Sequence, residues 1–142
     1  MKTMDILLVD DDNDSLHLLS MLLKGEGFEV AVASDGIQAM KVMAHINFRM
    51  MITDFCMPKM NGLELATKVK ELHSDTPVVL ITGNAVSDLI ESAFVAGISK
   101  VFSKPLDLQR LLSFIRPLLR ARQNCVLGER PLARGFQKLV GC

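Results

Sequence analysis

The sequence predicts an α/β fold, in which a doubly wound parallel sheet is covered by helices on both faces. Short apolar runs alternate along the chain with segments whose apolar residues recur at helical spacing. The apolar runs are continuous, which is typical of strands buried on both faces in a parallel sheet. Because Gly, Pro, Asn or Asp stands where each segment should end, we expect five strands and five helices in alternation.

Each expected strand is followed by its expected helix. The strands are expected at Ile6–Val9, Phe28–Ala33, Met50–Thr53, Pro77–Thr82 and Ile98–Ser103. The helices are expected at 16–25, Gly36–His45, Leu63–Leu72, Val86–Ala96 and Leu106–Arg120. Asn13 or Asp14 is the expected N-cap of the first helix. Pro117 is expected to bend the last helix or to end it early.

Length and charge predict one domain with a basic extension. The chain has 142 residues and is 49% hydrophobic, enough for one compact core. Residues 1–115 carry a net charge of −5 and residues 116–142 a net charge of +5. We expect a domain at residues 1–121 and a basic tail or linker at 122–142. That tail is either partly disordered or a short arm that docks on a partner or attracts nucleic acid.

Composition also excludes several classes of protein. No apolar run approaches the ~20 residues that cross a bilayer, and the N-terminus does not resemble a secretory signal. The three cysteines, at 56, 125 and 142, are an odd number without metal-type spacing. We therefore expect a soluble cytoplasmic protein without membrane contact.

Acidic, hydroxyl and ammonium groups follow the expected strands. Asp10 and Asp11 follow the first strand, Asp54 the third, Thr82 ends the fourth and Lys104 follows the fifth. In open parallel sheets, ligands bind beyond the carboxyl ends of the strands. Clustered carboxylates favour a hard divalent cation such as Mg²⁺, and one of them could act as a nucleophile toward phosphorus. This edge therefore predicts Mg²⁺-dependent phosphoryl chemistry.

Two other chemistries use similar acidic runs. A calcium EF-hand loop starting at Asp10 is excluded, because its sixth position would be Ser15 and not Gly, and its twelfth would be Met21 and not Glu. A haloacid-dehalogenase-type phosphatase would use Asp10 as nucleophile and Asp12 as acid. That family expects Thr or Val where this chain has Asp14, and it needs a longer chain. Asp12 and Asp14 are instead expected to favour the start of the first helix.

Four motifs in register resemble the receiver domain of bacterial two-component response regulators. They are LLVDDD at 7–12, DFCMPKMNG at 54–62, VLITG at 79–83 and SKP at 103–105. The resemblance covers residues 4 to about 121. It implies a flavodoxin-like (βα)5 sheet with strand order 2-1-3-4-5.

The resemblance also implies a role for each site residue. Asp54 would accept the phosphoryl group. Mg²⁺ would be held by Asp10, Asp11, Asp54 and the backbone carbonyl of Cys56. Thr82 would be the switch hydroxyl, and Lys104 would bind phosphate. The Lys104–Pro105 bond is expected to be cis.

The chain departs from the family pattern at several positions. Gly83 replaces the usual Ala after Thr82, which keeps phosphate access with a looser loop. Val101 stands where an aromatic side chain often swings inward. Cys56 and Asn84 flank the route of the hydrolytic water, and a thiol orients water poorly. We expect slow self-dephosphorylation, over minutes or longer.

The resemblance implies a signalling module that modifies itself and does not turn over a substrate. A histidine kinase or phosphotransfer domain would donate the phosphoryl group. A downstream protein, or a second copy, would bind through Val86–Ala96, Ile98–Ser103 and Leu106–Arg120. Ile90, Phe94 and Val101 would form an apolar patch there or belong to the core.

Three versions of this function stay open. The first is a single-domain regulator, and the second is the receiver end of a larger protein with a DNA-binding or catalytic output domain. In both, the receiver itself does not bind nucleic acid. The third, a phosphorylation-independent binding module, is disfavoured because the full set of site residues is present.

Overall fold

The computed structural model describes the backbone of residues 1–127 and the side chains of residues 1–119. The chain divides into two units, Met1–Leu106 and Asp107–Cys142. The first unit contains five strands and four helices, and the described part of the second contains one helix. Residues 128–142, most of the expected basic tail, lie outside the described residues.

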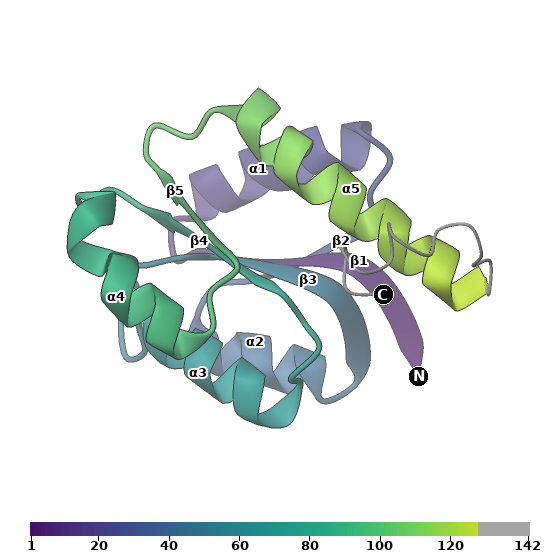
Figure 1. Ribbon diagram of the computed structural model, residues 1–142, viewed down its shortest axis with the longest axis horizontal. Helices are drawn as coiled ribbons and strands as arrows, with labels where there is room; N and C mark the ends of the chain where they lie inside the picture. The colour runs from purple at the N-terminus through teal and green to yellow at the C-terminus, as the bar shows by residue number, and fades with distance from the viewer. Residues whose placement is uncertain (128–142) are drawn as a thin grey trace. The chain divides into compact units, whose positions relative to one another are not determined.

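The five strands of the first unit form one parallel sheet (Figure 1). They are β1 (Lys2–Val9), β2 (Val30–Ala33), β3 (Ile46–Asp54), β4 (Val78–Thr82) and β5 (Lys100–Ser103). Their order is β2-β1-β3-β4-β5, and every neighbouring pair is parallel. The expected strand order is therefore confirmed.

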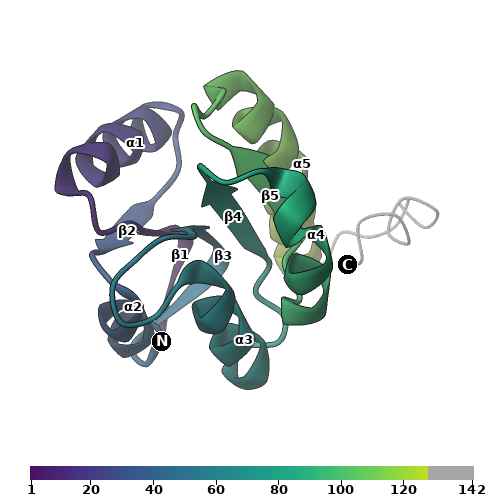
Figure 2. The ribbon, with the colours of Figure 1, turned by 90° about the vertical axis from the view of Figure 1, so that its left-hand side faces the viewer.

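Helices cover both faces of this sheet. They are α1 (Asn13–Gly25), α2 (Gly36–Met43), α3 (Gly62–Leu72) and α4 (Val86–Ala96). Two views at right angles show α1 on one face and α2 and α3 on the other (Figures 1 and 2). The doubly wound arrangement is thus already complete within the first unit.

The core on the α2–α3 side joins alternate strand residues to one face of α3. Leu7, Val9 and Met51 contribute from β1 and β3, and Leu65 and Val69 from α3; all five are 0% exposed. Each fully buried side chain of this size contributes about 1.5–3 kcal/mol relative to an exposed one. This packing fixes the sheet register that sets the positions of the strand ends.

Side chains mark the starts of two helices close to the strand ends. Asp12 is the N-cap of α1, where its carboxylate accepts a hydrogen bond from the Asp14 amide at 3.2 Å. The expectation of an N-cap at Asn13 or Asp14 was wrong, because the helix begins one residue earlier. Asn61 caps α3 in a reciprocal capping box with Glu64.

The central strands β1 and β3 begin earlier than the apolar pattern predicts. Their first residues pair with each other, with Lys2 opposite Ile46 and Met4 opposite Phe48. Asp5 and Arg49 form an ion pair at 3.5 Å in this extension. Because these first residues include polar side chains, a pattern of continuous apolar residues does not predict that they belong to the strands.

The second unit begins with α5 (Leu108–Leu127). The helix continues through Pro117 and past Arg120, so the expectation that Pro117 ends the helix early was wrong. The alternative, that Pro117 bends the helix, stays a prediction. A proline inside a helix removes one backbone hydrogen bond, and its ring crowds the carbonyl four residues earlier. The surrounding Leu, Arg, Ala and Gln residues favour helix and offset part of this cost. Among residues 1–127, no helix combines the length and apolar character needed to cross a membrane.

Candidate functional site

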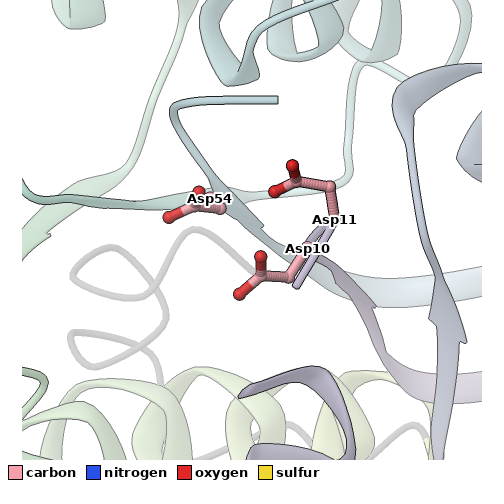
Figure 3. A group of neighbouring side chains, drawn as sticks. All are labelled: Asp10, Asp11 and Asp54. Atoms are coloured by element: carbon pink, nitrogen blue, oxygen red, sulfur yellow. The ribbon is translucent and has the colours of Figure 1, made fainter. Parts of the chain in front are cut away.

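Neighbouring strands bring three carboxylates to one edge of the sheet. Asp10 follows the last residue of β1, and Asp54 is the last residue of β3; the register pairs Val9 with Thr53. Oxygen atoms of Asp10, Asp11 and Asp54 lie within 4.8 Å of one another (Figure 3). Asp54 is 6% exposed, whereas Asp11 is exposed. The expected acidic cluster is therefore present, with Asp54 at its buried end.

The donor set fits a small hard cation. All three side chains offer oxygen, the ligand type that Mg²⁺ prefers. Octahedral Mg²⁺ with bonds of ~2.1 Å places its ligand oxygens about 3 Å apart when adjacent and about 4 Å apart when opposite. A group of oxygens within 4.8 Å is compatible with that geometry after small adjustments. Without a cation, three carboxylates this close repel one another.

Lys104 places an ammonium against the most buried carboxylate. Its Nζ lies 2.8 Å from Oδ1 of Asp54. Its backbone amide donates to the carbonyl of Thr82 at 2.8 Å, and the Lys104–Pro105 bond is cis, as expected. The hydrogen bond to Asp54 is the main cause that raises the pKa of Lys104. The ammonium therefore stays protonated over the physiological range.

Asp10 borders a small cavity whose other lining side chains are mostly apolar. Its Oδ1 accepts a hydrogen bond from the Asp12 amide at 3.0 Å. The apolar side chains that line this cavity include Leu8, Leu16 and Ile52. Burial raises the pKa of Asp10, and the hydrogen bond from Asp12 lowers it in part. The ionised carboxylate is thus held at a cost that a bound cation would offset.

Thr82 ends β4, the strand between β3 and β5. Its side chain is 1% exposed, and its Oγ1 accepts a hydrogen bond from the Asn84 amide at 2.9 Å. Its partner across the sheet on β5 is Ser103, the residue before Lys104. The hydroxyl is the acceptor in this hydrogen bond, which does not use its hydrogen. That hydrogen can therefore be donated to an acceptor at this edge of the sheet.

The six predicted site residues differ in how closely the structure connects them. Asp10, Asp11, Asp54 and Lys104 form one contacting group, and Thr82 joins it through the Lys104 backbone. Cys56 lies two residues beyond Asp54 with an exposed, free thiol. Its expected contribution is a backbone carbonyl, and that role stays a prediction.

Two residues at the site were missed by sequence reasoning. The Thr53 hydroxyl donates to the backbone carbonyl of Asp54 at 3.0 Å, and both groups are buried. Gly62, at the start of α3, lies so close that an added Cβ would be 2.5 Å from the same carbonyl oxygen. A polar residue between the apolar run at residues 50–52 and the acid was the available signal for Thr53.

Sequence comparisons identify relatives of most of the chain. Residues 6–116 match the family model described as the response regulator receiver domain. The transcriptional regulatory protein SrrA of Staphylococcus aureus is 30% identical over 131 residues. This match covers 92% of the chain but 54% of SrrA, so the chain spans about half the length of that relative.

Solved structures give the same result for the fold. The CheY-like receiver domain protein of Methanospirillum hungatei JF-1 has a TM-score of 0.78 at 27% identity, with 87% of this chain and 98% of that chain covered. The response regulator TrrA of Thermotoga maritima, solved in complex with Mg²⁺-BeF, has a TM-score of 0.72 at 27% identity. That match covers 82% of this chain and 98% of TrrA.

Proposed function

The chain belongs to the response regulator receiver domain family, and we propose that it is a phosphorylation-controlled signalling module in which Asp54 accepts the phosphoryl group. One observation carries this proposal. A nearly buried carboxylate lies within 4.8 Å of two others and 2.8 Å from an ammonium, at the carboxyl edge of a parallel sheet. Such a site combines a nucleophile with groups that offset charge on a phosphoryl group.

The family resemblance implies a role for each side chain, and the positions of the side chains are compatible with these roles. An oxygen of Asp54 forms a bond to phosphorus while the bond from phosphorus to the donor breaks, and the donor group leaves with its electron pair. Lys104 moves from the Asp54 oxygen to a phosphoryl oxygen, and Thr82 donates its hydroxyl hydrogen to another. Asp10, Asp11, Asp54 and the Cys56 carbonyl would hold Mg²⁺, which offsets negative charge when bound.

Receiver domains imply a phosphodonor partner, here a histidine kinase or a phosphotransfer domain. The protein modifies itself in this reaction and then loses the phosphoryl group slowly, since Cys56 offers little to orient a water. We propose that this phosphoryl transfer takes place in the cytoplasm. The odd number of cysteines is compatible with the reducing conditions of that compartment.

Phosphorylation would alter the surface formed by α4 and β5, which belong to the first unit. Thr82 and α4 are separated only by a short loop, and the α4 start at Ala85 lacks a side-chain cap. Ile90 and Phe94 are 53% and 84% exposed, which favours the patch interpretation over the core interpretation for these two. We propose that a downstream protein or a second copy binds there.

The domain limits follow the family resemblance. We propose a receiver at residues 1–121 followed by a basic tail or linker at 122–142, with α5 continuing across this boundary to Leu127. The alternative is the receiver end of a larger regulator with a DNA-binding or catalytic output domain. SrrA itself is about twice as long as the segment that matches this chain. Reading the gene beyond Cys142 decides between them.

The test of the proposed function is direct phosphorylation. The purified protein is incubated with Mg²⁺ and acetyl phosphate, and its intact mass is measured. We expect one phosphoryl adduct on the wild type and on Asp14→Asn, a control that removes an exposed carboxylate from α1. We expect none on Asp54→Asn. An adduct on Asp54→Asn, or none on a wild type that binds Mg²⁺, would contradict the proposal.

A further inference from the structure

Thr53 is a polar residue in an apolar layer. It is 0% exposed in β3, where side chains alternate between faces, so it points to the same face as Met51 and away from that of Asp54. Its partners across the sheet are Val9 and Leu80, both 0% exposed. The position is therefore part of the core beneath α3.

A hydroxyl in this layer is costly unless it makes a hydrogen bond. Valine has nearly the same shape as threonine and would fill the position without that cost. The Thr53 hydroxyl instead donates to the carbonyl oxygen of Asp54 at 3.0 Å. The hydrogen bond thus holds the backbone of the residue whose side chain carries the proposed reaction.

The peptide that follows Asp54 is fixed on several sides. Gly62 packs against the Asp54 carbonyl, where an added Cβ would lie 2.5 Å away. The Phe55 amide donates to the Ile81 carbonyl and the Phe55 carbonyl accepts from the Gly62 amide, both at 2.8 Å. A rotation of this peptide would therefore be transmitted to the loop that it begins.

We infer that Thr53 is a positioning residue for phosphorylation, acting through the peptide between Asp54 and Phe55. Its hydroxyl fixes the orientation of that peptide. The orientation in turn sets the direction of the Asp54 carboxylate and of the Cys56 carbonyl, one residue further along. This inference rests on the proposed function and adds to it a residue that touches neither metal nor phosphate.

The principal test is Thr53→Val, which removes the hydroxyl and keeps the shape. Since the chain lacks Trp and Tyr, Mg²⁺ affinity is measured by isothermal titration calorimetry and not by intrinsic fluorescence. We expect Mg²⁺ affinity and the rate of modification by acetyl phosphate each to fall roughly tenfold or more, the scale on which groups behind metal ligands act.

The matched control is Thr67→Val on α3. Thr67 also donates its hydroxyl to a backbone carbonyl, that of Leu63, at the same 3.0 Å, but away from the acidic cluster. We expect this variant to bind Mg²⁺ and to be phosphorylated as the wild type is. Thermal unfolding of both variants separates a loss of stability from a loss of positioning.

A second pair keeps the test decisive if Thr53→Val does not fold. Thr53→Ser and Thr53→Ala both remove the methyl group, and only the first retains the hydroxyl. We expect Thr53→Ser to retain most of the affinity and rate, and Thr53→Ala to lose both.

The inference is overturned if Thr53→Val unfolds at lower temperature but keeps wild-type Mg²⁺ affinity and phosphorylation rate. If Thr53→Val does not fold, the same result for Thr53→Ala overturns it. The hydroxyl would then serve stability alone. Failure of the proposed function looks different, because the wild type itself would then acquire no adduct on Asp54.

Discussion

The Lys104 ammonium lies 2.8 Å from Oδ1 of Asp54, so the carboxylate proposed to be phosphorylated already has a cationic partner. Three carboxylates and one ammonium leave two negative charges at the edge of the sheet. One divalent cation carries the charge that balances them. If the proposed function holds, the ion pair would compete with the metal for Asp54 and would also keep a positive group close to the phosphoryl oxygens.

Replacing Lys104 with methionine should separate these two effects. The variant lacks the repulsion between the Lys104 ammonium and Mg²⁺, which is ~1 kcal/mol, so its Mg²⁺ affinity should be about fivefold higher. The same variant should be modified more slowly by acetyl phosphate, because no ammonium then offsets charge on the phosphoryl oxygens. Calorimetry measures the first change and intact-mass kinetics the second.

Lys100→Met is the control for the Lys104 variant. Lys100 is an exposed lysine on β5 whose Nζ lies 5.8 Å from the Phe102 ring centre, away from the carboxylates. We expect it to leave both measurements unchanged. Weaker Mg²⁺ binding by Lys104→Met would refute the competition between ammonium and metal.

Asp10→Asn should stabilise the metal-free protein at neutral pH. Burial raises the pKa of Asp10 above 3.8, so the folded state binds this proton more tightly than the unfolded state. Stability from this group is consequently lost as the pH rises above 3.8 through the folded-state pKa. The gain in the variant should reach at most about 1 kcal/mol, because the carboxylate is partly exposed.

Circular dichroism melts over a pH series, with and without Mg²⁺, measure this effect. The advantage of Asp10→Asn should disappear toward pH 3.8 and below. Saturating Mg²⁺ should reverse the order, since it stabilises the wild type by mass action. An Asp10→Asn protein that Mg²⁺ stabilises as strongly as the wild type would exclude Asp10 as a ligand.

Two glycine substitutions should have opposite consequences. In Gly62→Ala the new Cβ would lie 2.5 Å from the Asp54 carbonyl oxygen and 2.6 Å from Leu80 Cδ1, so α3 must move away from the site. We expect a loss of stability of about 1–3 kcal/mol, typical of overpacking, together with weaker Mg²⁺ binding. Urea unfolding and calorimetry measure the two losses.

Gly83→Ala is the matched substitution in the loop after Thr82. The nearest atom to its new Cβ would be Lys104 Cδ at 4.0 Å, an ordinary contact. We expect no loss of stability and a gain of up to about 1 kcal/mol from reduced freedom in the unfolded chain. A large destabilisation would mean that the loop needs a backbone conformation restricted to glycine.

The lifetime of the phosphorylated protein should depend on Cys56. The wild-type adduct is expected to persist for minutes or longer after acetyl phosphate is removed. Cys56→Asn supplies an amide that can orient water, so its adduct should disappear several times faster. Intact mass over time follows both proteins, and a wild-type half-life of seconds would contradict the expectation.

The arrangement of the main site groups could be predicted because it depends on topology. Parallel strands end at a common edge, so apolar runs followed by Asp10 and Asp54 place those two side chains together. The hydrogen bond of Thr53 and the close approach of Gly62 could not be predicted. They depend on side-chain rotamers and on the height at which α3 crosses the sheet, which a pattern of apolar residues does not specify.

Helix α4 shows a second limit of pattern reading. Its apolar residues occur around most of the helix, so spacing alone could not separate buried from exposed positions. The structure buries Ala93 and leaves Phe94 and Val95 84% and 80% exposed. A small residue thus faces the core at this point of α4, while two large apolar side chains next to it face solvent.

The two edge strands of the sheet, β2 and β5, are each four residues long, whereas the central strands β1 and β3 have eight and nine. A sheet edge is a template on which another chain can add a strand, and short edges offer few free backbone groups for this. The protein should therefore resist fibril-like aggregation when it accumulates in a crowded cell. Any association between copies would therefore have to use side-chain surfaces and not the sheet edges.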